Sequence, residues 1–270
     1  NGLVMGPWPH GGWARSAGDR FGHFEFDSPT SAYYREQIEL PFFNRYLKDH
    51  QDLPTLANAY IFYTGSNQWE TYEQWPPKET ETRKLYLQAG GKLSFVQGQE
   101  STTQFDEYIT DPNKPVPHTN EIRPNPGREY MIEDQRFAAF RPDVLTYTSE
   151  ILTEDITLAG PIFPNLHISS SGTDTDFVVK LIDAYPDSTR NLKDTPPHIK
   201  LSEYQRLVRA DVLRAKFRNS LSNPEPLAPN QITPIKFELQ DVAHTFKKGH
   251  RIVVQVQSTW FPLVDRNPNT

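Results

Sequence analysis

The chain has no cysteine among its 270 residues, so disulfides, thiolate metal sites and a cysteine nucleophile are excluded. No apolar run approaches the length of a membrane-spanning helix, and we expect no membrane partner. Lysine and arginine are scattered without a long basic run, and the formal net charge is −6, which argues against a nucleic-acid partner. An extracytoplasmic location is preferred over a cytoplasmic one, because the lack of cysteine and the polar loops fit it.

Proline, by contrast, is abundant, with 24 residues, and hydrophobic residues make up 36% of the chain, enough to build a core. Because prolines interrupt helices and central strands, this composition favours a mainly β, loop-rich fold. Many short apolar runs separated by turn residues are typical of a jelly-roll β-sandwich. The predicted strands are 57–63, 84–88, 93–96, 144–148, 156–159, 165–170, 177–184, 204–209, 235–239 and 251–257, and a long proline-rich loop is predicted over 106–127.

The clearest helical pattern runs from Pro29 to about Asp49. Ser28 is a predicted capping hydroxyl, followed by proline at the first helical position. Pro41 lies inside this pattern, and we expect it to kink or split the helix because it has no backbone N–H to donate.

The most informative segment is at the start of the chain, where a short apolar run predicts a strand that ends at Gly-Pro. His10 follows in a loop with Gly11 and Gly12, flanked by Trp8 and Trp13. In α/β-hydrolases the catalytic serine, acid and histidine follow one another in this order along the chain. If His10 is such a histidine, its nucleophile and its acid must precede residue 1.

The chemistry of a serine hydrolase suits a histidine in this setting. An imidazole accepts the serine proton and later returns it, since its pKa lies near neutrality. Gly11 and Gly12 let the backbone turn without a side chain in the pocket. We expect Trp8 or Trp13 to wall the site, with simple packing as the alternative. Without further context, a lone histidine is more often a surface or structural residue.

Several blocks of sequence, taken in order, resemble one family of serine hydrolases. These blocks are residues 5–13, 40–48, 64–69, 75–77, 129–137, 141–145, 172–177, 246–251 and 258–262. The family includes the bacterial cocaine esterase, the α-amino-acid ester hydrolases, the glutaryl-cephalosporin acylases and the X-Pro dipeptidyl-peptidases.

The resemblance implies an α/β-hydrolase domain with an inserted helical cap, followed by a jelly-roll of galactose-binding-like topology. Residues 1–52 would be the C-terminal strand-loop-helix end of the hydrolase domain. Residues 53–270 would be the jelly-roll, truncated at its end. The family's Ser-Asp-His triad transfers to His10 alone, because the G-x-S-x-G nucleophile motif does not occur in this sequence.

The resemblance also implies a longer parent protein that cleaves ester or amide bonds, of acyl or X-Pro dipeptidyl type, while the isolated chain is inactive. The expected partners are the upstream hydrolase and cap domains and a small acyl or peptide substrate, and a homo-oligomer is left open. We expect no cofactor and no metal. Six of the seven other histidines, considered as metal ligands, show no HxH or HxxxH spacing, which argues against zinc: His23, His118, His167, His198, His244 and His250.

The rival function is a non-catalytic β-sandwich that binds carbohydrate or is purely structural. A sugar-stacking face is one interpretation of four aromatic residues, and core packing is the other: Trp69, Tyr72, Trp75 and Trp260.

Two groups of charged residues each have two interpretations. Asp174 and Asp176 suggest either a calcium site or, in preference, a polar loop, as do Asp106, Asp111 and Asn113. A set of arginines and acids suggests either a buried ion-pair cluster that docks the long loop onto the hydrolase domain, or a solvated charged surface: Arg123, Arg128, Arg136, Arg141, Glu129, Glu133 and Asp134.

Overall fold

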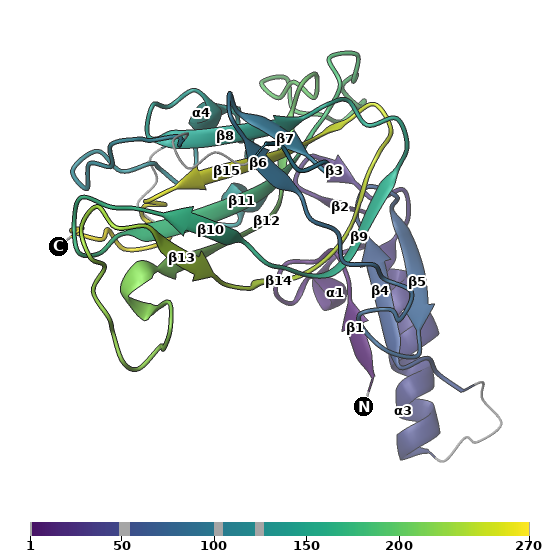
Figure 1. Ribbon diagram of the computed structural model, residues 1–270. Coiled ribbons are helices and arrows are strands. Elements are labelled where there is room, and N and C mark those ends of the chain that lie inside the picture. Colours follow the sequence, from purple (N-terminus) through teal and green to yellow (C-terminus); the bar gives the residue numbers. More distant parts are fainter. Residues whose placement is uncertain (1, 49–54, 100–104, 122–126, 270) are drawn as a thin grey trace.

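The computed structural model describes residues 2–48, 55–99, 105–121 and 127–269. Within these residues the chain is mainly β, as predicted, and Figure 1 shows most of the strands gathered in a large upper body. The strands are β1 (Leu3–Met5), β2 (Arg20–Phe21), β3 (Phe24–Glu25), β4 (Ala59–Tyr63), β5 (Gln68–Tyr72), β6 (Tyr86–Gln88), β7 (Lys92–Ser94), β8 (Val144–Ser149), β9 (Ile156–Ile162), β10 (Asn165–Ile168), β11 (Asp176–Ala184), β12 (Gln205–Arg214), β13 (Thr233–Lys236), β14 (Leu239–Phe246) and β15 (Arg251–Gln257).

Helical segments are few and mostly short. They are α1 (Gly12–Arg15), α2 (Thr30–Tyr33), the π-helical η1 (Tyr34–Glu39), α3 (Leu40–Leu47), α4 (Arg136–Ala139) and the 3₁₀ turns η2 (Glu129–Met131) and η3 (Ala215–Phe217). In the part of the chain that the structure describes, we find no helix with the length and apolar character needed to cross a bilayer.

The main sheet has six strands in the order β12-β11-β15-β8-β7-β6. Strand β11, second in this order, pairs antiparallel with β12 and β15 and is buried along nearly its whole length. The strand predicted over 177–184 is therefore confirmed, and it is covered on both faces. Strands β6 and β7 correspond to the predicted strands 84–88 and 93–96 and form a hairpin around Gly90 and Gly91.

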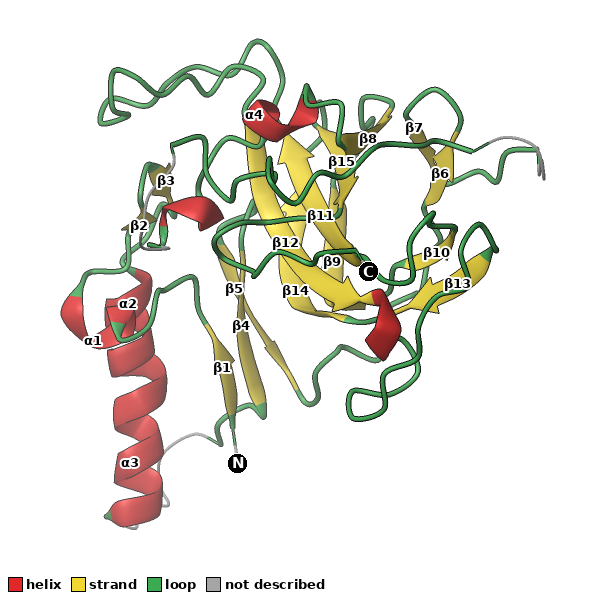
Figure 2. Cartoon of the chain, turned by 90° about the vertical axis from the view of Figure 1, so that its left-hand side faces the viewer, coloured by secondary structure: helices red, strands yellow, loops and turns green. Residues whose placement is uncertain are grey.

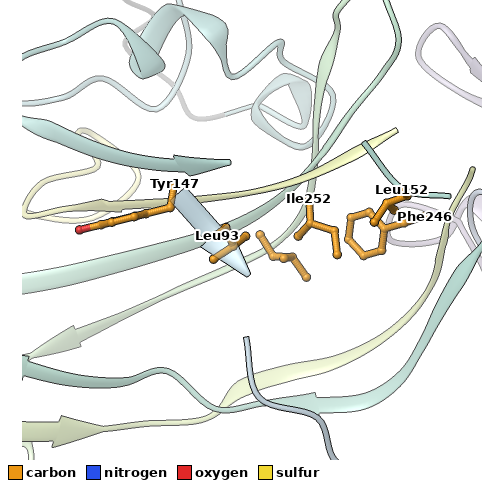
Figure 3. Packing of buried hydrophobic residues seen from close by; sticks show 6 residues of the cluster. Leu93, Tyr147, Leu152, Phe246 and Ile252 are labelled. Atoms are coloured by element: carbon orange, nitrogen blue, oxygen red, sulfur yellow. The ribbon is translucent and has the colours of Figure 1, made fainter. Parts of the chain in front are cut away.

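One face of this sheet packs against the pairs β9–β14 and β10–β13, which form a second layer. The core between the layers has two clusters. One is Leu93, Tyr147, Leu152, Leu181, Phe246 and Ile252, of which Figure 3 shows the packing; the other is Phe177, Val179, Ala215, Leu227, Ile235 and Val256. We call these two layers the sandwich.

The other face of the six-stranded sheet is covered by the proline-rich segment and α4. Val116, Phe137 and Ala138 pack there against Val144 of β8. The Val116 N–H donates to the Thr259 hydroxyl at 2.7 Å, which ties the segment to the chain after β15. Among the described residues of 106–127 there is no helix and no strand, as predicted.

A separate three-stranded sheet, ordered β1-β4-β5, extends from the sandwich (Figure 2). β1 pairs in parallel with β4, and β4 pairs antiparallel with β5. Parallel neighbours need a crossover connection, and α1, α2 and α3 lie on that connection. The β1–β4 pairing crosses the boundary predicted between residues 52 and 53, which itself lies outside the described residues.

The predicted helix is present, but its details differ. It begins at Thr30 rather than Pro29, and Ser28 does not cap it, because the Ser28 hydroxyl donates to the Phe26 carbonyl instead. Pro41 does not split the helix. The six residues of η1 directly before α3 adopt the wider π-helical conformation, which gives room where the proline ring would crowd the preceding turn.

Candidate functional site

His10 lies in the turn between β1 and α1, in the loop that follows the strand, as predicted. The turn is held by the Gly12 N–H, which donates to the Pro9 carbonyl at 2.8 Å. Gly11 adopts the left-handed conformation with φ 75°, which favours glycine, and directly precedes α1. The His10 side chain is exposed, and its ring lies edge-on to that of Trp13, with the ring centres 6.2 Å apart.

Trp8 and Trp13 lie on the same loop as His10, with ring centres 6.4 Å apart. Trp8 is half-buried and packs against Tyr34 at 5.3 Å and Trp69 at 5.8 Å, while Trp13 is 36% exposed. A Cβ at Gly6 would lie only 2.4 Å from the Trp8 ring, so this packing requires glycine there. Trp8 thus serves mainly to fix the loop, and Trp13 is the more exposed of the two beside His10.

The four aromatic residues considered as a sugar-binding face are not brought together. Trp69 lies with Trp8, whereas Tyr72 and Trp75 pack on each other, and Trp75 donates its indole N–H to Asp241 at 2.5 Å. Trp260 is only 5% exposed. These contacts support the packing interpretation.

Asp174 and Asp176 are buried, but cationic side chains satisfy them. Arg214 binds Asp176 through two N–H groups at 2.9 and 3.0 Å, and Lys216 lies 3.2 Å from Asp174. The Asn267 amide donates to both carboxylates. Their oxygens are therefore engaged in ion pairs and hydrogen bonds rather than arranged around a cation.

The predicted arginine cluster divides into separate pairs. Arg136 binds Asp134 and the Ser202 carbonyl, which anchors the segment before α4 to the sandwich. Arg141 pairs with Asp143 at 2.7 Å. Arg123 lies outside the described residues.

A buried hydrogen-bond network that the sequence did not reveal joins the end of β4 to β14 and β11. The Thr64 hydroxyl lies 2.8 Å from His244 Nδ1, and His244 Nε2 lies 3.3 Å from Asp183. The second oxygen of Asp183 lies 2.8 Å from His250 Nδ1. Since these residues are far apart in sequence, no spacing signal was available to find them.

This hydrogen-bond network has one favoured protonation state, with His244 neutral and Asp183 ionised. Burial lowers the pKa of His244, so its ring is neutral near pH 7. Burial would raise the pKa of Asp183, but hydrogen bonds from His244 and His250 outweigh it and hold that pKa below its usual value. His244 then donates from Nε2 to Asp183 and accepts from Thr64 at Nδ1.

Replacing Thr64 with valine should lower the free energy of unfolding by about 1–3 kcal/mol, because it leaves the buried His244 Nδ1 without its donor. Urea unfolding measures this. Thr71→Val, at an exposed position on β5, is the control and should change stability little. Equal stability of the two variants would contradict the role given to Thr64.

His23 links the β2–β3 hairpin to the sandwich. Its ring packs on Phe24 at 4.3 Å and against Tyr204 at 5.1 Å, and Arg206 lies over Phe24 at 4.3 Å. Burial, assisted by the charge of Arg206 and opposed by that of Asp134, lowers the pKa of His23 to about 4.

Acid should therefore weaken this contact. In the unfolded chain His23 binds a proton near pH 6.5, whereas in the folded chain it does so only near pH 4, so stability falls as the pH drops through this window. We expect a loss of about 1 kcal/mol per pH unit at most from this residue. Unfolding curves at pH 7, 6 and 5 should show a shallower decline for His23→Gln than for the exposed control His167→Gln, and parallel declines would disprove the assignment.

A second feature that the sequence did not reveal is Lys180, which is fully buried in the middle of β11. Its ammonium nitrogen donates to Gln135 Oε1 at 2.9 Å and lies over the rings of Trp260 and Phe137. Burial lowers the pKa of Lys180 to about 7. None of the ion pairs among the described residues includes it.

Comparison with known proteins gives consistent matches. The family model of the X-Pro dipeptidyl-peptidase C-terminal non-catalytic domain matches residues 51–270. The cocaine esterase of Rhodococcus sp. (strain MB1 Bresler) is 32% identical over 99% of this chain and 45% of its own length. Putative serine esterase Mb1866c of Mycobacterium bovis is 24% identical over 94% of this chain and 40% of its own length.

Two solved structures superpose on the whole chain. One is an α-amino-acid ester hydrolase with 41% identity and a TM-score of 0.90, covered over 44% of its length. The other is an aminopeptidase from a marine sediment archaeon (Thaumarchaeota archaeon) with 38% identity and a TM-score of 0.89, covered over 43%. The chain thus spans less than half the length of these relatives.

Proposed function

Because this chain belongs to the family of the X-Pro dipeptidyl-peptidase C-terminal non-catalytic domain, we propose that it is the C-terminal part of a serine hydrolase that cleaves ester or amide bonds. The observation that carries the proposal is the position of His10, in a glycine-supported turn at the end of a strand in a parallel pair. Relatives named as esterases and as an ester hydrolase support the reaction class.

In this proposal His10 is the general base and acid of the parent protein. It takes the proton of an upstream serine as that serine attacks the substrate carbonyl, and it returns the proton to the leaving group. Water then attacks the acyl-enzyme, and His10 takes the proton of the water and returns it to the serine. The serine and the acidic member of the triad lie upstream, since this sequence has no G-x-S-x-G motif.

The apolar surface of the three-stranded sheet and its helix supports an upstream partner. Leu40, Phe43 and Leu47 follow one another at helical spacing along α3 and are 55%, 48% and 75% exposed. Among the described residues, β4 is the one neighbour of β1 in its sheet, so the outer edge of β1 is open to a further strand. We assign the upstream hydrolase domain of the same protein as the partner that covers both.

We assign the sandwich to the jelly-roll class of galactose-binding-like topology, and residues 1–52 and 53–270 to the end of the hydrolase domain and to the jelly-roll. The sandwich contacts the hydrolase end directly through His23, and Thr64 and Trp75 join it to the sheet in which β4 pairs with β1. The substrate is a small acyl or peptide compound, and its identity depends on upstream residues.

Labelling with a fluorophosphonate serine probe tests the proposal, on this 270-residue chain and on the parent protein in parallel. We expect the parent protein alone to be labelled. Stoichiometric labelling of the isolated chain would place the reactive serine inside it and overturn the proposal.

A further inference from the structure

The segment that carries His10 is closed at both ends by one side chain, that of Thr30. The indole N–H of Trp8 donates to Thr30 Oγ1 at 2.8 Å. The same hydroxyl donates to the Gly18 carbonyl at 2.5 Å. Trp8 precedes His10 by two residues, and Gly18 follows it beyond α1, so Thr30 joins the start and the end of the turn.

Thr30 is well placed to hold this connection. Its side chain is completely buried at the start of α2, so water does not compete for its hydroxyl. Gly18 has φ 71°, and a Cβ there would lie 2.6 Å from Thr30 Oγ1 and 2.2 Å from Ser31 Oγ. The Ser31 N–H also donates to the Ala17 carbonyl at 3.0 Å. The close approach therefore depends on glycine at one side and a small hydroxyl residue at the other.

The other end of the connection is equally constrained. Trp8 packs between Tyr34 of η1 and Trp69 of β5, and the hydrogen bond to Thr30 sets the rotation of its indole ring. A Cβ at Gly12 would lie 3.0 Å from Trp8 Cβ and 2.9 Å from Pro9. The backbone that leads into His10 is thus fixed from both sides, although the His10 side chain itself is exposed.

We propose that Thr30 is a positioning residue for His10: its hydroxyl clamps the turn between Trp8 and Gly18 and so fixes the backbone that aims the imidazole at the upstream serine. This inference rests on the proposed function. A displacement of about 1 Å in a reacting group costs on the order of 100-fold in rate, so a clamp on this turn has a direct kinetic effect.

The test is Thr30→Val in the parent protein, with Thr30→Ser as the conservative variant. Valine keeps the shape but leaves the Trp8 N–H and the Gly18 carbonyl unpaired, whereas serine keeps the hydroxyl. We expect kcat to fall at least tenfold in Thr30→Val with little change in KM, and Thr30→Ser to restore it to within about twofold of the natural protein. Thr175→Val is the matched control, because Thr175 is also a buried hydroxyl, bonded to Ser258 in the sandwich.

The inference is overturned by a kcat for Thr30→Val no lower than that for Thr175→Val, or by a failure of Thr30→Ser to restore the rate. If Thr30→Val does not fold, Trp8→Phe removes the same donor and should lower kcat in the same way. A full rate in that variant would also overturn it. Failure of the proposed function shows separately, as fluorophosphonate labelling of the isolated chain.

Discussion

Replacing His10 with alanine in the parent protein should lower kcat by at least about 10³-fold while leaving the fold intact. Without the imidazole, the serine hydroxyl has no base to take its proton and remains a poor nucleophile. The side chain is exposed in a turn, and no hydrogen bond of its ring is found among the described residues, so its loss should cost little stability. Hydrolysis of a p-nitrophenyl ester gives the rate, and thermal unfolding checks the fold.

The control for this experiment is His167→Ala. His167 is an exposed histidine on β10 in the sandwich and has no role in the proposed reaction. The control should hydrolyse the ester at the natural rate. Near-normal turnover in His10→Ala would remove His10 from the mechanism and leave only the supporting role of this chain.

The stability of the chain should rise as the pH increases from 7 to about 9.5, because of Lys180. Its pKa is about 7 in the folded chain and near 10.5 when unfolded, so in this window the unfolded state binds one more proton. The expected slope is about 1.4 kcal/mol per pH unit, or roughly 3 kcal/mol over the window. Above it, tyrosines of the unfolded chain begin to ionise.

Lys180→Met should remove this slope, since methionine has a similar unbranched shape and carries no charge at any pH. The matched control is Lys193→Met, at an exposed position in the loop between β11 and β12, and it should keep the slope. Guanidinium unfolding at four pH values from 7 to 9.5 measures both. A slope that persists in Lys180→Met would show that another group dominates.

Most of the sandwich strands could be predicted from short apolar runs between turn residues. The strand at 177–184 was the clearest, because its nearly continuous apolar run is typical of a strand buried on both faces, as β11 is. β14 was mostly missed, since its buried residues include His244 and Thr245 and its pairing with β9 is interrupted by a bulge. Apolar periodicity carries no information about polar residues that are buried in networks.

The candidate site shows the same limit. His10 could be found because the histidine and its supporting glycines are neighbours in sequence. Thr30 could not, since its partners are brought to it only by the fold. The burial of Lys180 could not be predicted for a different reason. A single lysine in an apolar strand gives no sign in the sequence that its own side chain is buried.

The pairing of β1 with β4 has a practical consequence for protein engineering. The family match begins at residue 51, but the hydrogen bonds of the sheet do not divide there. A sandwich excised at that position would keep β4 and β5 and lose β1, exposing an apolar strand edge that invites aggregation. A cut after β5 would instead remove Thr64 and leave Nδ1 of the buried His244 without its donor. Exchange of C-terminal domains between relatives should therefore preserve β1, β4 and β5 as one unit.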